Sequence, residues 1–307
     1  MKRLAAIVLS GLLAITVLAG CGTTASQSTP VASSTGTSSS KAPESTFDTS
    51  KSIAVISRED GSGTRGAFVE LVGILEEVDG QKVDMTTQGA NIVNSTSVVV
   101  TTVVGDPYSI GYISLGSLDD SVKAFKIDGV EASAENINNG TYPIYRPFNI
   151  AVSKNAAEGT EDFIKFVLST QGQEVVTENG YIALKDAQDY AASGASGKIV
   201  IAGSSSVSPL MEKLVEAYKV LNPDVQIEIQ TSDSTTGMNN AIDGICDIGM
   251  ASRNLKDAEL EAGLEPVVIA NDGIAVIGNL ENSVNDLSKD SIGSIFKGDI
   301  TTWAELA

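Results

Sequence analysis

The chain has 307 residues, of which 42% are hydrophobic and 29 are glycine, a composition typical of a folded protein of about two domains. It carries 39 Asp and Glu against 20 Lys and Arg, and the formal charge of −19 argues against nucleic acid or an anionic membrane surface as the main partner. The absence of histidine excludes Ser-His-Asp and Cys-His catalysis, and two cysteines are too few for a thiolate metal site, so we expect no metal and no cofactor.

The first 20 residues are typical of an export signal. Two basic residues precede an apolar stretch over 4–19, which is shorter than the roughly 20 residues that span a bilayer. Residues 18–21, Leu-Ala-Gly-Cys, resemble a bacterial lipobox, in which Cys21 is acylated and becomes the new N-terminus. Residues 21–48 are rich in Ser and Thr and predict a disordered tether. We therefore expect a lipid-anchored protein on the extracytoplasmic face of the cell membrane, with Cys246 as a small buried hydrophobic residue.

Short β-branched runs alternate with amphipathic stretches in the rest of the chain. In chain order, the pattern predicts a strand at 52–57, a helix at 66–78, strands at 108–115 and 146–152, and helices at 161–168 and 172–178. After a linker at 191–197 it predicts a strand at 198–202, a helix at 207–221 and strands at 225–229 and 247–250, followed by a long apolar run at 266–277. A last helix begins after Ser288 and ends at Gly298. This alternation predicts an α/β protein with mainly parallel sheets covered by helices, with a ligand where strand ends meet helix starts.

Three strand-to-helix junctions carry glycines and small hydroxyl residues. They lie at 58–65 (Arg-Glu-Asp-Gly-Ser-Gly-Thr-Arg), 203–206 (Gly-Ser-Ser-Ser) and 232–237 (Ser-Asp-Ser-Thr-Thr-Gly). Helix N-termini present unpaired N–H groups and a partial positive charge, and small side chains let an anion approach them. Plain N-capping explains any one of these junctions, but three together favour an anion-binding site. Arg58, Arg65 and Arg253 lie near these loops and could add charge.

Several motifs resemble the PstS family of phosphate-binding proteins of bacterial phosphate ABC transporters. These motifs are ISREDGSGTRGAF at 56–68, IAGSSSVSPL at 201–210, DIGMASR at 247–253, DGIAVI at 272–277 and IGSIFKGDITTW at 292–303. The resemblance implies a two-lobed periplasmic-binding-protein-like (type II) fold with a ligand cleft between the lobes. It also implies capture of inorganic phosphate, delivery to membrane permease subunits, a monomeric state and no enzymatic activity.

The motifs stand in an unusual order, because in the family the block that begins like IAGSSSVSPL precedes the block that contains DGSGTR. The chain therefore resembles a circularly permuted family member, with a splice at 185–197 and with Ala307 near residues 49–52. The resemblance then implies one lobe from 49–140 plus 275–307 and a second lobe from 141–274, with hinge segments near 140–147 and 272–275. Two sequential domains at 49–185 and 198–307 are the alternative.

The resemblance also implies roles for individual residues. Arg58 matches the ligand-binding arginine of the family, and Asp60 matches the acid that holds this arginine in place. The other expected ligand-binding residues are Ser62, Gly63, Thr64, Ser205, Ser206, Ser234, Ser252 and Arg253. Several family members have an aspartate where this chain has Ser252 followed by Arg253, which makes the preference for protonated phosphate over sulfate less secure.

Other functions remain open at this stage. The ligand could be sulfate, molybdate or tungstate, and the protein could be a surface anion sensor or adhesin that transports nothing. A serine hydrolase with Ser62 as the nucleophile is a remote alternative, since it would need a lysine such as Lys51 or Lys297 as its base.

Overall fold

The computed structural model describes residues 47–306, so the expected signal peptide, Cys21 and the tether up to residue 46 lie outside the described residues. The strands are β1 Ala54–Arg58, β2 Leu75–Val78, β3 Gln81–Asp84, β4 Asn91–Val93, β5 Ser109–Ser114, β6 Lys123–Ala124, β7 Lys126–Ile127, β8 Tyr145–Val152, β9 Gly197–Ser204, β10 Val225–Ser232, β11 Ile248–Ala251, β12 Pro266–Gly278 and β13 Asp286–Leu287. The α-helices are α1 Gly63–Leu71, α2 Thr96–Gly105, α3 Ala134–Asn138, α4 Thr160–Val167, α5 Thr170–Glu178, α6 Ser208–Leu221, α7 Ser234–Ile242, α8 Asp257–Glu261 and α9 Lys289–Lys297. Among these described segments, no helix has both the length and the apolar character that a membrane span requires.

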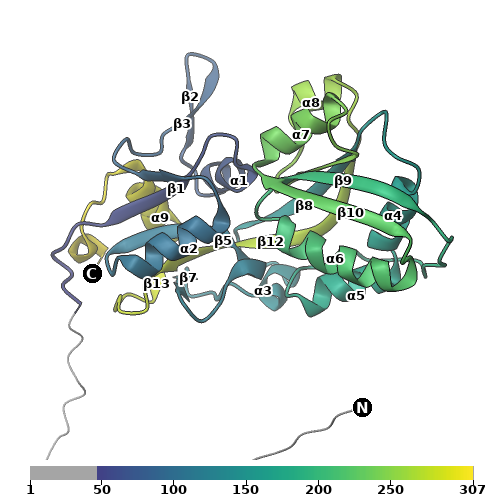
Figure 1. The fold of residues 1–307 in the computed structure, drawn as a ribbon. Coiled ribbons are helices and arrows are strands. Elements are labelled where there is room, and N and C mark those ends of the chain that lie inside the picture. The colour runs from purple at the N-terminus through teal and green to yellow at the C-terminus, as the bar shows by residue number, and fades with distance from the viewer. Residues whose placement is uncertain (1–46, 307) are drawn as a thin grey trace, which may run out of the picture. The chain divides into compact units, whose positions relative to one another are not determined.

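One mixed sheet holds most of these strands, in the order β10-β9-β11-β8-β12-β5-β1-β4, with β6 paired to β12. The outer strands run parallel to their neighbours on both sides, in β10-β9-β11 and in β5-β1-β4. In the middle, β8 and β12 run antiparallel to every strand beside them, so the expectation of mainly parallel sheets is wrong there. The strand β12 joins the two outer parts of the sheet, because it pairs with β8 over 266–273 and continues beside β5 over 274–278 (Figure 1).

The hydrophobic cores fall into two groups along the chain. Two clusters draw on residues 55–144 and 274–303, with Ile182 added, and two others draw on residues 148–270. The strand β12 serves both groups, since Ile269 packs in the second and Ile274 in the first. Figure 1 shows the same division, with α2 and α9 beside one part of the sheet and α4 to α7 beside the other. Each part has its own buried core, which is what a lobe requires.

Most predicted elements are present, but the region after α1 differs from the prediction. The helix expected to continue to residue 78 ends at Leu71, and Gly73 follows with a φ of +74°, a conformation that glycine adopts without steric cost. Residues Leu75–Val78 instead form a hairpin with β3. The apolar residues of this segment fit either period, which is why the helical interpretation was wrong. The predictions that Ser288 is the N-cap of the last helix and that Gly298 ends it are confirmed, and Gly298 adopts the left-handed conformation.

The two ends of the described chain lie side by side. The N–H of Ile53 donates to the carbonyl of Thr301 at 2.8 Å, and the N–H of Ala304 donates to the carbonyl of Thr49 at 2.7 Å. Trp303 is buried between them, and its Nε1 donates to the carbonyl of Tyr108. The chain segments near residues 50 and 302 therefore meet on the same part of the sheet.

Candidate functional site

The loop from β1 into α1 carries the first glycine-serine turn. Ser62 is the N-cap of α1, and its Oγ accepts a hydrogen bond from the N–H of Arg65 at 3.3 Å. The loop passes close to the start of α7, because a Cβ on Gly61 would lie 2.3 Å from Oδ1 of Asp233, and one on Gly63 would lie 2.4 Å from Oγ of Ser234. Only glycine fits such an approach without movement of its neighbours.

The other two turns come from the residues 141–274 side of the sheet. Ser205 and Ser206 lie between β9 and α6, where the strand ends and the helix begins. Ser234 is the first residue of α7, whose N-cap Asp233 accepts from the N–H of Thr236 at 2.9 Å. Ser252 follows β11, and its N–H donates to Oγ of Ser234 at 3.1 Å. The ends of three parallel strands thus deliver three small hydroxyl segments to one edge.

These segments meet in a group of seven buried side chains that we call the hydroxyl cluster. Its members are all at most 7% exposed: Thr64, Thr96, Ser204, Ser205, Ser206, Ser234 and Ser252. Oγ1 of Thr64 lies 2.8 Å from Oγ of Ser206 and 3.2 Å from Oγ of Ser252. Oγ of Ser204 in turn lies 3.0 Å from Oγ of Ser252. Hydroxyl groups both donate and accept hydrogen bonds, so the cluster can bind an oxyanion with or without a proton.

Arg58 borders the hydroxyl cluster from β1. Its side chain is buried, and Nη2 lies 3.2 Å from Oγ of Ser205. Its backbone N–H donates to the Tyr112 hydroxyl, whose pKa burial raises to about 12. The guanidinium pairs with both carboxylate oxygens of Glu59, at 2.7 and 2.8 Å.

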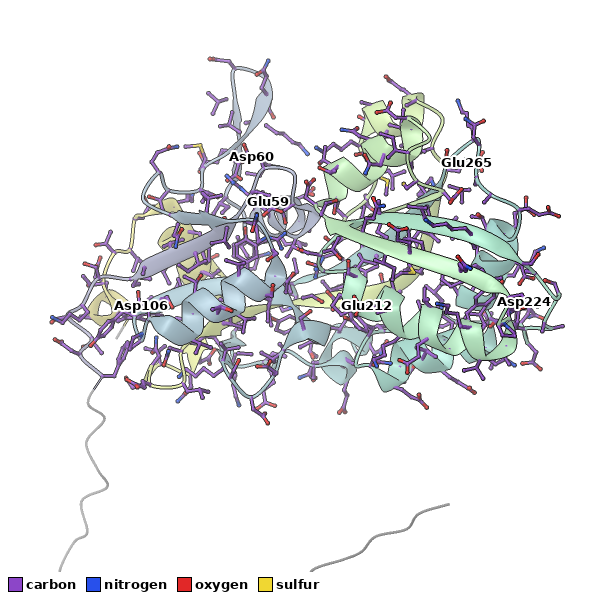
Figure 2. All side chains as sticks on the ribbon, in the orientation of Figure 1. Glu59, Asp60, Asp106, Glu212, Asp224 and Glu265 are labelled. Carbon is purple, nitrogen blue, oxygen red and sulfur yellow. The ribbon has the colours of Figure 1, made fainter. Side chains whose placement is uncertain are left out.

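The expectation for Asp60 therefore needs correction. The acid that holds Arg58 is Glu59, whereas Asp60 is 95% exposed and pairs with Arg65 at 2.8 Å. Both acids lie on the loop between β1 and α1 (Figure 2). Glu59 is the neighbour of Arg58 in the chain, and its carboxylate can reach the guanidinium as a bidentate partner. Asp60 follows one residue later and lies beside Arg65 instead.

Arg253 lies next to the cluster but turns its charge away from it. The guanidinium binds both carboxylate oxygens of Glu259, at 2.7 and 2.9 Å, and Nη2 also donates to Oγ1 of Thr235 at 3.2 Å. The stem of the side chain lies near Gly63, since a Cβ there would be 3.0 Å from Cγ of Arg253. In this arrangement Arg253 packs against the first turn of α1, and its charge is compensated by α8.

Three residues of the site were missed by sequence reasoning. Thr96 begins α2, a helix of β-branched residues that was not predicted, and its Oγ1 lies 3.2 Å from Oγ of Ser206. Ser204 directly precedes Ser205 and Ser206, which were predicted to bind the ligand, but it was not itself predicted. Arg146 lies in β8 and is 3% exposed, with Nη2 donating to Oγ1 of Thr64 at 3.1 Å. The available signal for Arg146 was that it is the one charged residue of the predicted strand at 146–152.

Two cavities flank the hydroxyl cluster. A cavity of about 670 Å³ is lined by Arg146 and Arg253 together with residues of α1 and of the 254–257 loop. A second cavity of about 420 Å³ is lined by Thr96 and Ser205 together with Ser208 and Thr231. Each cavity has walls from both core groups, and each reaches members of the site. The cluster therefore lies between two openings rather than at the surface.

The arginines of the site contribute little excess formal charge. Arg58, Arg146 and Arg253 each lie 2.6 to 2.7 Å from a carboxylate oxygen, of Glu59, Asp272 and Glu259 respectively. The electrostatic attraction for an anion must then come mostly from hydroxyl and N–H donors and from the N-termini of α1, α6 and α7. Among the residues that the structure describes, no group of three or more Cys, Asp or Glu side chains could hold a metal ion.

The structure gives no support to the serine hydrolase alternative. The Ser62 hydroxyl is an acceptor in the α1 cap, and Lys297 lies 2.8 Å from Oε1 of Glu76 in an ion pair. Lys51 is exposed and lies 3.9 Å from Oδ2 of Asp48, also in an ion pair. A lysine base must be neutral and must contact the serine hydroxyl, and both lysines are instead bound to carboxylates.

Comparisons with known proteins agree with this architecture. A family model described as PBP superfamily domain matches residues 33–171 and 189–307. The chain is 50% identical over 308 residues to the Phosphate-binding protein PstS 2 of Streptococcus agalactiae, covering 100% of this chain and 98% of the relative. It is 34% identical over 130 residues to the Phosphate-binding protein PstS of Pseudomonas aeruginosa, covering 38% of this chain and 40% of that one.

A solved structure is also similar. The crystal structure of a phosphate ABC transporter, phosphate-binding protein from Streptococcus pneumoniae TIGR4 has a TM-score of 0.66 and 47% sequence identity to this chain. The match covers 83% of this chain and all of that one. The predicted periplasmic-binding-protein-like α/β fold is therefore confirmed. The chain belongs to the PBP superfamily and, within it, to the PstS family.

Proposed function

We propose that this protein is a substrate-binding protein of a phosphate ABC transporter, which captures inorganic phosphate and delivers it to the membrane permease subunits. The observation that carries the proposal is the hydroxyl cluster, in which Thr64 from one core group meets Ser206 and Ser252 from the other. The names of the PstS relatives support the same ligand and transporter class. The protein is a binding protein for transport and not an enzyme.

The two core groups support the two-lobe arrangement that this function needs. We take residues 49–140 plus 275–307 as one lobe and 141–274 as the other, joined at the hinge segments near 140–147 and 272–275. A ligand stabilises the closed arrangement of two lobes only through contacts that it makes there and not in the open arrangement. Hydroxyl groups from both lobes at one place supply such contacts. The cavities on either side provide the routes by which an anion could enter.

Phosphate is the first choice among oxyanions, although Ser252 and Arg253 stand where several family members have an aspartate. The hydroxyls of the cluster can accept the proton of hydrogen phosphate, and sulfate has no proton to donate. Calorimetric titration of the purified full-length protein with phosphate, sulfate, molybdate and tungstate tests the assignment. We expect phosphate to bind at least about tenfold more tightly than the others, a difference of about 1.4 kcal/mol. Tight sulfate binding without phosphate binding would overturn the ligand but not the fold.

We also propose the lipid anchor and the cellular location. The export signal at 1–20, the lipobox that ends at Cys21 and the Ser/Thr-rich tether at 21–48 support a lipoprotein on the extracytoplasmic face of the membrane. Labelling of growing cells with radioactive palmitate should mark the wild-type protein and should not mark the C21S variant. Slower phosphate uptake in a deletion strain would separate transport from a sensor or adhesin that only binds.

The circular permutation remains a proposal, and two observations support it. An alignment that keeps chain order can match only one of two blocks whose order is exchanged. The alignment to the Pseudomonas PstS covers only 38% of this chain, as expected for one block, whereas the alignment to the Streptococcus agalactiae relative covers all of it. Residues 49–53 and 301–304 also hydrogen-bond to each other, as joined blocks require. A chain re-permuted by linking residue 306 to residue 49 and opening the segment 185–197 should fold and bind phosphate. Failure of this chain to fold, with the wild type stable, would contradict the proposal.

A further inference from the structure

Arg146 occupies an unusual place for a charged residue. It lies in β8, directly opposite Asp272 of β12, where both strands pass from one core group to the other. Arg146 is 3% exposed and Asp272 is fully buried. Charged groups are rarely buried without a reason, because removing them from water carries a large free-energy cost. The pair therefore needs an explanation beyond the stability of the sheet.

The contacts of Arg146 direct one part of its guanidinium to the hydroxyl cluster. Nη1 bonds to the Gly273 carbonyl at 2.9 Å and pairs with Oδ2 of Asp272 at 2.6 Å. Nε donates to the Ser252 carbonyl at 3.2 Å, and Nη2 donates to Oγ1 of Thr64 at 3.1 Å. A guanidinium has five N–H groups, and three of them make these hydrogen bonds, whereas the contact with Oδ2 of Asp272 is an ion pair without hydrogen-bond geometry. Nη2 carries a second N–H beside the Thr64 hydroxyl.

A second buried guanidinium borders the same cluster. Arg58 approaches from β1 and donates to Oγ of Ser205, whereas Arg146 approaches from β8 and donates to Thr64. Burial lowers the pKa of Arg146, Asp272 opposes this effect, and the positive charge of Arg58 adds to the lowering. Burial likewise raises the pKa of Asp272 to about 6, against the opposing effect of Arg146. Arg58 and Arg146 thus bring guanidinium N–H donors to one hydroxyl cluster from two different strands, where an oxyanion would accept charge-assisted hydrogen bonds from both.

We propose that Arg146 is a direct ligand-binding residue, which donates from the base of the site to the same oxyanion that Thr64, Ser206 and Ser252 bind. This inference rests on the proposed phosphate-binding function and adds a residue to it. Because Arg146 also bonds the Gly273 carbonyl and Asp272 on β12, the ligand is connected through one side chain to both strands that join the lobes. Asp272 supplies the counter-charge of the buried guanidinium.

Four variants of the full-length protein test the inference by calorimetric titration with inorganic phosphate. Arg146→Gln removes the charge and should weaken the Kd about 10- to 100-fold, as expected for a lost charge-assisted hydrogen bond. Arg146→Lys keeps the charge but not the planar fork and should recover part of this loss. The double variant R146Q/D272N removes both buried charges. Lys198→Gln removes a surface cation that pairs with Glu228 and serves as a control with the same change in net charge.

The double variant separates ligand binding from a structural role. If Arg146 only neutralises Asp272, R146Q/D272N should bind phosphate like the wild type, and this result would overturn the inference. If Arg146 binds the ligand, the double variant stays at least about tenfold weaker in Kd, even where its thermal stability exceeds that of R146Q. Wild-type affinity in R146Q would also overturn the inference while leaving the proposed function intact. Absence of phosphate binding by the wild type would overturn both, so the two failures are distinguishable.

Discussion

Gly63 offers a direct test of how closely the two sides of the site approach each other. It is the first residue of α1 and has no positive φ, so alanine fits its backbone and would improve the helix. The added methyl group would nevertheless lie 2.4 Å from Oγ of Ser234 and 2.8 Å from Oγ of Ser252. Ordinary contact begins at 3.4 Å, so Ser234 must move by about 1 Å, and its hydrogen bond from the N–H of Ser252 is then lost.

The expected cost of G63A is about 1–3 kcal/mol when the two sides of the site meet, which corresponds to a Kd for phosphate about 5- to 150-fold weaker. Separation of the two sides of the site would relieve the clash, so we expect the free energy of unfolding in urea to change by less than about 1 kcal/mol. Gly66 is the matched control, because it lies in the same helix and a Cβ there would meet only Cδ of Arg253 at 3.9 Å. Calorimetry should find wild-type affinity in G66A. Equal affinities in G63A and G66A would refute the close approach of the two sides.

Three further variants and measurements test separate parts of the structure. Glu59→Gln leaves the buried Arg58 without its carboxylate and should lower the free energy of unfolding by about 2–4 kcal/mol. Asp60→Asn changes an exposed residue and should alter the free energy of unfolding by less than about 0.5 kcal/mol. Equal effects of the two variants in urea denaturation would contradict the assignment of Glu59 as the acid that holds Arg58. Burial raises the pKa of the Cys246 thiol to about 11, so about 0.1% of this side chain is thiolate at pH 8. Its rate of labelling by a disulfide reagent should therefore increase about tenfold per pH unit up to pH 11. Fast labelling at pH 8 would show an accessible thiol and would contradict its burial. Trp303→Ala should cost about 3–5 kcal/mol of unfolding free energy by circular dichroism, and no loss would contradict the docking of the segment 301–304.

Local chemistry made much of the fold predictable. Capping residues act on the backbone next to them, so Ser288 and Gly298 could be assigned from sequence, and so could the turns at the starts of α1 and α7, which Ser62 and Asp233 cap. The helix α2 could not, because its sequence TSVVVTTVVG is rich in β-branched residues, which favour strands. Burial of Val99 and Val103 against β1 and β5 stabilises the helix instead. Tertiary packing overrides intrinsic propensity at this position.

The parts of the site that sequence reasoning missed depend on contacts between distant segments. Arg146 and Thr64 are 82 residues apart, and only the antiparallel pairing of β8 with β12 places Arg146 beside Asp272 at the base of the site. The mainly parallel sheet expected from the strand-helix alternation gave no reason to pair these strands. The acid for Arg58 was misassigned for a related reason, since the loop conformation decides whether Glu59 or Asp60 reaches the guanidinium.

The central claim is that three small-residue turns from two lobes bind one oxyanion together. A crystal structure of the full-length protein grown with arsenate, located by its anomalous scattering, tests it most directly. We predict a single arsenate whose oxygens lie about 2.5–3.2 Å from the hydroxyls of Thr64, Ser206 and Ser234, one from each turn, and of Ser252. Arsenate bound elsewhere, such as in the cavity beside Asp162 and Tyr190, with the hydroxyl cluster bonded only to itself, would contradict the claim.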